Sequence, residues 1–264
     1  MPLPAEVAEV TARFLTAVDE RAPGLVEGLY LHGSLALTGE FFPGSDIDFA
    51  AVLPGRPGEA DLDALAAAHE AVRAARPQPL FEGIHLVRAD LAGPPDACPD
   101  LPFIHEGRFE RAGRFSISPV TWHELAGHAI TVRGPALAGQ DVWTDERVLW
   151  DFSHANLGSY WAKVAGLLVA MPERAGLPDA TAWCVLGISR LHHLLATGSM
   201  TSKSGAGRYA LTVFGPRWHP VIHEALRARE RPQAPSGYPS VPARAQDTTE
   251  FTAMALQAGL AITR

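Results

Sequence analysis

The sequence is most informative over residues 29–53, where Leu29-Tyr30-Leu31-His32-Gly33-Ser34 is followed, after eleven residues, by Asp46-Ile47-Asp48-Phe49-Ala50-Ala51-Val52-Leu53. Both apolar runs predict buried strands, and a glycine–serine turn follows the first. Side chains alternate faces along a strand, so Asp46 and Asp48 point the same way. Two carboxylates held this close need a cation, and their hard oxygen atoms favour Mg²⁺. The pattern therefore predicts metal-dependent chemistry on a nucleoside triphosphate.

A third carboxylate, Glu82, lies within the next predicted strand, residues 80–87, which is apolar on both faces. A carboxylate buried in a central strand needs a reason, and a position beside the two aspartates would supply one. There it could accept the proton of an attacking hydroxyl group. The alternative is a glutamate at a sheet edge that faces water.

The glycine–serine turn predicts a cradle for phosphate groups. Gly33 lets the backbone approach a phosphate closely, because glycine has no Cβ. Ser34 is expected to begin a short helix, whose free N–H groups and dipole favour an anion. Phosphate cradle, metal ligands and base are together what nucleotidyl transfer requires.

Composition limits the possible classes of protein. The chain has 264 residues, 47% of them hydrophobic and 19% charged, which is typical of a globular protein with a substantial core. A net charge of −7 argues against nucleic acid as a partner and would attract a small cationic substrate, although mild acidity can also serve solubility alone. No membrane span or export signal is expected, and two widely spaced cysteines, Cys98 and Cys184, favour a cytoplasmic location. We expect a monomer.

The pattern of elements changes near residue 140. Residues 1–140 predict an α/β (α+β) domain with a mixed sheet, in which prolines 94, 95, 99 and 102 mark a loop. Residues 141–264 predict an all-α helical bundle. Its helices are expected near residues 144–171, 179–197, 203–213, 217–230 and 245–262, with a proline-rich loop over 231–243.

Two motif groups resemble known families. The run from Leu31 to Ser34, Ser45-Asp46-Ile47-Asp48 and Glu82 together resemble the DNA polymerase β-type nucleotidyltransferase superfamily. The second half is similar to the C-terminal helical domain of the aminoglycoside adenylyltransferases that inactivate streptomycin and spectinomycin. The residues that carry this second resemblance are Ile188-Ser189-Arg190-Leu191, Thr197-Gly198, Ser202-Lys203 and Pro220-Val221-Ile222-His223-Glu224-Ala225.

The resemblance implies a nucleotidyltransferase catalytic domain over residues 1–140 and a helical domain over 141–264 that binds substrate and ATP. It implies Mg²⁺-dependent transfer of AMP from ATP to a hydroxyl of an aminoglycoside-type antibiotic, which confers resistance. Arg190 would organise the site, and Lys203 would bind triphosphate together with Gly33, Ser34 and Ser45. The candidates for drug contacts are Trp161, Glu173 and Asp179, although Trp161 is equally suited to a helix core.

Other readings of the sequence remain open. The same fold could adenylylate a protein or another small-molecule hydroxyl, or serve as a non-catalytic nucleotide-binding regulator. The regulator would be favoured if Glu82 were exposed and distant from the aspartates. His105-Glu106 could approach the active site but is more often a structural pair. His123-Glu124 and His128 resemble a zinc-protease signature, but the offset of five residues rotates the second histidine off the ligand face.

Overall fold

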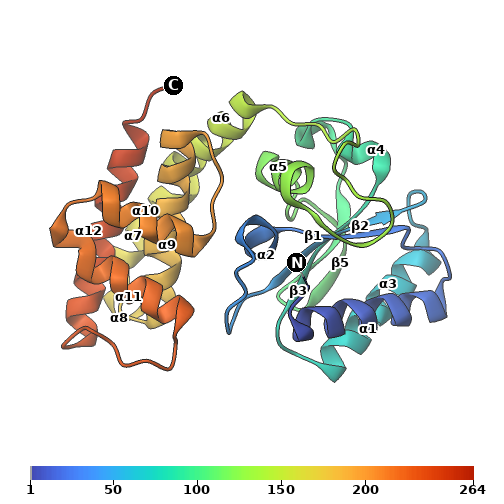
Figure 1. Cartoon of the computed structure of the whole chain (residues 1–264), viewed down its shortest axis with the longest axis horizontal. Helices are drawn as coiled ribbons and strands as arrows, with labels where there is room; N and C mark the ends of the chain where they lie inside the picture. Colours follow the sequence, from blue (N-terminus) through green and yellow to red (C-terminus); the bar gives the residue numbers. More distant parts are fainter. Residues whose placement is uncertain (1) are drawn as a thin grey trace. The chain divides into compact units, whose positions relative to one another are not determined.

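A computed structural model describes residues 2–264 of the chain (Figure 1). The chain forms two compact units that divide between Asp145 and Glu146. The first unit holds all the strands within the described residues, and the second is helical. No helix among residues 2–264 combines the length and apolar character needed to cross a membrane.

The first unit is built on one mixed sheet with the strand order β5-β4-β3-β2-β1-β6. Strands β2 and β3 are parallel, and the other neighbouring pairs are antiparallel. The mixed sheet predicted from the sequence is thereby confirmed. The strands are β1 (Gly28–Leu31), β2 (Ile47–Leu53), β3 (Phe81–Val87), β4 (Leu101–His105), β5 (Arg108–Gly113) and β6 (Ile130–Arg133).

Helices cover both faces of this sheet, which is why β2 and β3 are apolar on both sides. Helices α1 (Ala5–Arg21) and α3 (Glu59–Ala75) lie on one face, and α4 (Arg88–Leu91) and α5 (Pro119–His128) lie on the other (Figure 1). Phe14 and Phe49 belong to the first apolar cluster, and Trp122 belongs to the second. Helix α2 (Gly33–Thr38) follows β1 directly, as the glycine–serine turn predicted.

The loop predicted to extend through Pro102 ends earlier, and Pro102 lies in a strand. The loop, which includes a short 3₁₀ turn at Pro95–Ala97, stops before Leu101, and β4 and β5 then form a hairpin. Proline lacks an N–H group and is normally excluded from paired strands. Pro102 is tolerated because the pairing of β4 with β5 is irregular between Leu101 and Phe103.

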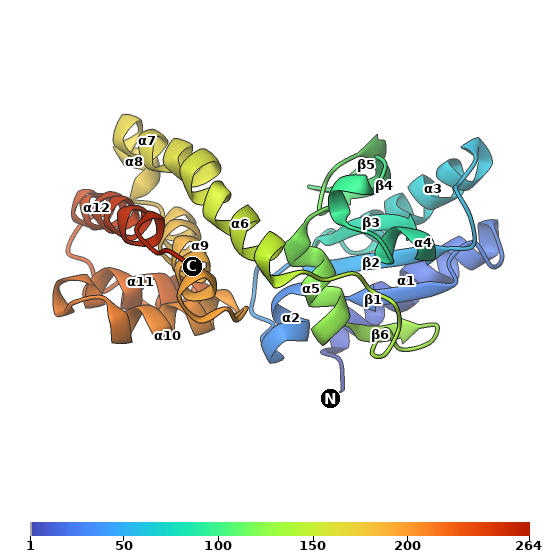
Figure 2. The same ribbon diagram turned by 90° about the horizontal axis from the view of Figure 1, so that it is seen from above.

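The second unit is a bundle around α9 (Pro178–Thr197), which packs against α6, α10, α11 and α12. The other helices are α6 (Glu146–Asn156), α7 (Ala162–Ala170), α8 (Pro172–Ala175), α10 (Lys203–Val213), α11 (His219–Glu230) and α12 (Val241–Leu260), with a 3₁₀ turn at Pro216–Trp218 before α11. Figure 2 shows α6 and α7 as one nearly continuous helix, joined by a π-helical turn at Leu157–Trp161. The all-α fold predicted for this half is confirmed.

The proline-rich loop is shorter than predicted, because α12 begins at Val241 and not near residue 245. Ser240 caps this helix by accepting a hydrogen bond from the N–H of Ala243 (3.3 Å). Pro242 occupies the first turn, where its missing N–H group breaks no helical hydrogen bond. The first residues of α12 therefore lie within the segment that its prolines predicted to be a loop.

Candidate active site

Two of the three predicted carboxylates lie side by side on parallel strands. Asp48 of β2 is directly paired with Glu82 of β3, so both side chains lie on the same face of the sheet. Glu82 is only 7% exposed, because β3 is flanked by β2 and β4. The alternative of a glutamate at a sheet edge facing water is therefore wrong. Asp46 stands one residue before β2 and is exposed.

Both oxygen atoms of Glu82 are engaged by the turn between β4 and β5. Oε2 lies 3.1 Å from Nδ1 of His105, and Oε1 accepts a hydrogen bond from the backbone N–H of Glu106 (2.5 Å). The His105 ring also stacks on Phe115, with 4.3 Å between the ring centroids. The pair His105-Glu106 thus reaches the predicted base.

The turn after β1 brings the backbone against Asp48. Gly33 has φ +70°, a left-handed conformation that strongly favours glycine. A Cβ atom at this position would also overlap Oδ2 of Asp48. Gly33 is therefore required by its backbone angle and by the approach of the carboxylate. Ser34 follows in the first turn of α2.

A buried acidic residue that the sequence reasoning did not assign to the site holds this turn. Oε2 of Glu124, on α5, accepts a hydrogen bond from the N–H of Gly33 (3.2 Å) and lies 2.9 Å from Nδ1 of His32. Burial acts to lower the pKa of His32, but the hydrogen bond to Glu124 and the charges of Glu124 and Asp48 outweigh it and raise that pKa. In the sequence, Glu124 was noted only as part of the apparent zinc-protease signature. That pattern does not predict a contact with Gly33 or His32.

Ser45 organises the loop that leads into β2. Its Oγ accepts a hydrogen bond from the N–H of Phe42 (3.1 Å), and its own N–H donates to the carbonyl oxygen of Phe42 (2.9 Å). Ser45 is 5% exposed. These contacts fix the point from which Asp46 and Asp48 follow.

The two predicted cationic residues belong to the second unit. Arg190 lies on α9 and is half-buried. Lys203 is the first residue of α10, next to Ser202, which caps the helix by accepting from the N–H of Gly205 (3.0 Å). The ammonium group of Lys203 lies 4.5 Å from the centroid of the Trp183 ring, which is 46% exposed. Sequence reasoning missed Trp183, which lies on α9, far from Lys203 in the sequence.

The substrate residues proposed from the resemblance have different surroundings. Trp161 is 4% exposed in the core of the second unit, and its indole ring packs against Gly187. Its assignment as a drug contact is corrected here, because a ring enclosed by core side chains presents no face to a substrate. Glu173 on α8 and Asp179 in the first turn of α9 are exposed.

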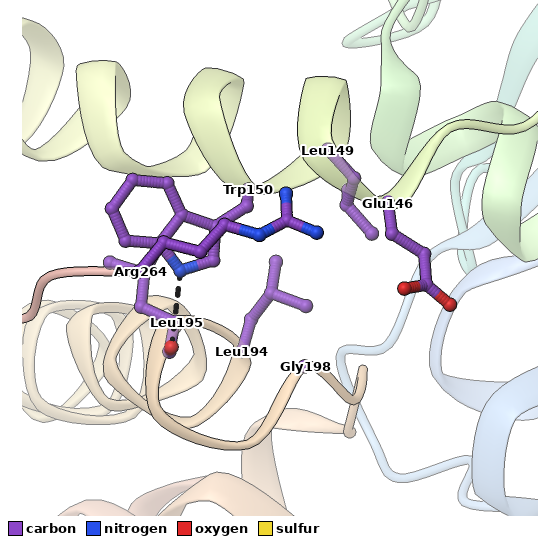
Figure 3. Close-up of a pocket in the computed structure, with 7 residues that line it drawn as sticks. All are labelled: Glu146, Leu149, Trp150, Leu194, Leu195, Gly198 and Arg264. Atoms are coloured by element: carbon purple, nitrogen blue, oxygen red, sulfur yellow. Dashed lines mark hydrogen bonds between the residues drawn. The ribbon is translucent and has the colours of Figure 1, made fainter.

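A separate cavity of about 180 Å³ lies within the second unit (Figure 3). Its wall includes Trp150, whose indole N–H donates to the carbonyl oxygen of Leu195 (3.2 Å). The charged residues beside it are Glu146 and Arg264. None of the predicted site residues lines this cavity.

The available metal ligands are limited. No group of three or more His, Cys, Asp or Glu side chains within residues 2–264 is arranged to hold a metal ion. Asp46 and Asp48 provide two carboxylates at alternate positions. Mg²⁺ in phosphoryl-transfer sites is usually held by one or two carboxylates together with substrate phosphates, so this donor set is of the kind Mg²⁺ uses.

The chain is similar to known proteins in both halves. Residues 12–81 match the family described as nucleotidyltransferase domain, and residues 159–252 match the C-terminal domain of aminoglycoside adenylyltransferase. A search of curated protein sequences finds no significant match. The first match contains Gly33, Asp46 and Asp48 and ends immediately before Glu82, while the second contains Arg190 and Lys203.

A solved structure is similar in fold over most of the chain. It is the crystal structure of the spectinomycin adenyltransferase AAD(9) from Enterococcus faecialis with ATP and spectinomycin. The two are 14% identical with a TM-score of 0.61, and the comparison covers 93% of this chain and 98% of that one. The structural likeness concerns the fold alone; the two family matches, which follow one another along the chain, identify it as a nucleotidyltransferase enzyme of the aminoglycoside adenylyltransferase type.

Proposed function

We propose that this enzyme transfers AMP from ATP to a hydroxyl of an aminoglycoside-type antibiotic of the streptomycin and spectinomycin class. The pairing of Asp48 with Glu82 on adjacent parallel strands carries the proposal, since it places a buried carboxylate beside an expected metal ligand. The ATP and spectinomycin of the structural neighbour support this choice of substrates. The net charge of −7 also suits a cationic drug.

Asp46 and Asp48 would hold Mg²⁺. The metal, when bound, would neutralise charge on the triphosphate. In the first unit, Gly33, Ser34 and Ser45 would bind phosphate groups. In the second unit, Arg190 and Lys203 are the expected ligands of the triphosphate. Positioning and charge stabilisation supply most of the catalysis in reactions of this kind.

Glu82 would act as the general base. It takes the proton of the acceptor hydroxyl as that oxygen forms a bond to the α-phosphorus of ATP. The bond between the α-phosphorus and pyrophosphate breaks, and pyrophosphate leaves with the electron pair. Glu173 and Asp179 remain candidates for binding the cationic drug, because both carboxylates are exposed.

The test is release of pyrophosphate from ATP in the presence of Mg²⁺ and a panel that includes streptomycin, spectinomycin and related drugs. We expect drug-dependent release in wild-type protein and a loss of at least about 100-fold in Asp48→Asn. Asp96→Asn, an exposed aspartate before β4, is the matched control and should keep wild-type activity. Silence across the whole panel would refute the drug assignment, and near-normal turnover of Asp48→Asn would refute the metal role.

The alternatives give different outcomes in the same assay. A protein adenylyltransferase would label protein with AMP and ignore the drugs. A non-catalytic regulator would bind ATP without releasing pyrophosphate. An exposed Glu82, distant from the aspartates, would have favoured the regulator. Glu82 is instead buried and adjacent to Asp48.

A further inference from the structure

The turn that holds Glu82 has a defined backbone geometry. His105 pairs with Arg108, so the loop of the hairpin consists only of Glu106 and Gly107. These residues have φ +49° and +71°, as a type I′ turn requires. The turn continues the twist of the two strands, and it directs the N–H of Glu106 at Oε1 of Glu82.

The imidazole of His105 completes the arrangement from the other side. An ionised carboxylate can only accept hydrogen bonds, so Nδ1 of His105 must carry the hydrogen in its contact with Oε2 of Glu82. The stack on Phe115 limits rotation of the imidazole ring. A carboxylate has about four acceptor positions, of which His105 and Glu106 use two. The others remain for a hydroxyl proton.

We propose that His105 is a positioning residue that orients the carboxylate of Glu82 for proton abstraction. The inference rests on the proposed function, in which Glu82 is the base. Donation from Nδ1 holds one rotamer of a side chain that has three rotatable bonds, so the proton-accepting oxygen keeps a fixed place beside Asp48.

A purely structural role predicts different behaviour. The hairpin has its own backbone pairs, including Phe103 with Glu110 and Ile104 with Phe109, so it does not depend on the His105 side chain. That side chain is 45% exposed and contributes little to the core. Substitution should therefore leave the fold intact and change turnover.

Two variants separate the hydrogen bond from the ring. His105→Phe keeps a ring for the stack on Phe115 but removes the donor, whereas His105→Asn places an amide N–H near the position of Nδ1. We expect His105→Phe to lower kcat about 10- to 100-fold with KM for ATP unchanged, because the His105 side chain contacts the proposed base. His105→Asn should retain most of kcat. His128→Asn, an exposed histidine of the same unit, is the control.

The measurements are pyrophosphate-release kinetics and the ¹⁵N NMR signature of the His105 tautomer. A hydrogen on Nδ1 in wild-type protein supports the inference, and a neutral ring protonated only at Nε2 overturns it. Wild-type kcat in His105→Phe, or equal losses in the Phe and Asn variants, would also overturn it while leaving the proposed function intact. Inactive wild-type protein would instead refute the proposed function and, with it, a catalytic purpose for this contact.

Discussion

A pair of buried histidines in the first unit should make its stability depend on pH. Nε2 of His69 lies 3.1 Å from Nε2 of His85, and both rings are enclosed by aromatic side chains that include Phe14 and Phe49. Nδ1 of His85 lies 3.3 Å from the carbonyl oxygen of Pro102, so it carries the hydrogen. His85 therefore accepts from His69 through Nε2, which requires His85 to be neutral. Burial opposes a charge on either ring.

The size of the effect follows from the pKa values. Burial lowers the pKa of His85 from 6.5 to about 4. Burial, and then the charge of His85, lowers the pKa of His69 well below 6.5. As pH falls below 6.5, these two histidines bind protons in the unfolded chain but remain neutral in the folded protein. The contribution of this histidine pair to the free energy of unfolding is therefore fully present above pH 6.5 and decreases as pH falls from 6.5 towards 4. For His85 alone the difference between 6.5 and about 4 corresponds to about 3 kcal/mol.

The test compares wild-type protein with the double variant His69→Leu/His85→Leu. Denaturant unfolding is measured at pH 7 and pH 4, with hydrogen exchange of the β2 and β3 amides reporting the first unit, since a two-unit chain need not unfold in one step. Wild-type stability should fall between these pH values by at least about 3 kcal/mol more than that of the double variant. The variants share all other titrating groups, so these cancel in the comparison.

Two results would refute this reasoning. One is an equal pH dependence in the wild-type protein and the double variant. The other is an NMR titration in which the imidazole of His85 protonates near pH 6.5 in folded protein. Either result would mean that the pair is hydrated or charged in the native state.

Two further substitutions test the proposed nucleotide contacts. Gly33→Ala should lower AMP transfer by about 100-fold or more, because the new Cβ would overlap the Asp48 carboxylate. The control for backbone strain in the same pyrophosphate assay is Gly24→Ala, because Gly24 has φ +80° and a Cβ there would meet no atom within 4 Å. Trp183→Ala should raise KM for ATP a few-fold, because the ring helps to position the Lys203 ammonium group through their cation–π contact. ATP should also change the fluorescence of Trp183 in wild-type protein, and a variant that keeps both the wild-type KM and the ATP-dependent fluorescence change would contradict the prediction.

Several features could be predicted because they depend on neighbours in the sequence. Periodicity placed α10 at residues 203–213, and alternation along β2 placed Asp48 on the opposite face of the sheet from Ile47 and Phe49. The same local rules gave a glycine at the turn before α2. The fold class followed from these elements, since a mixed α/β half and an all-helical half differ in their apolar repeat.

Other features depended on contacts between distant parts of the chain. Glu124 reaches Gly33 across 91 residues, and His105 reaches Glu82 across 23, so no local pattern specifies either contact. The hairpin of β4 and β5 was missed because the prolines before it are turn signals, and the pairing of β4 with β3 overrides them.

The sequence by itself therefore indicated which residues are candidates for the chemistry: the aspartates, Glu82 and the glycine–serine turn are of types that local rules can recognise. Only the tertiary structure decided what surrounds them. Trp161 shows the limit most clearly, because an aromatic residue on a helix suits a core and a ligand surface equally. The physical reason is that burial and hydrogen bonding depend on which elements meet in space, and that depends on the whole chain.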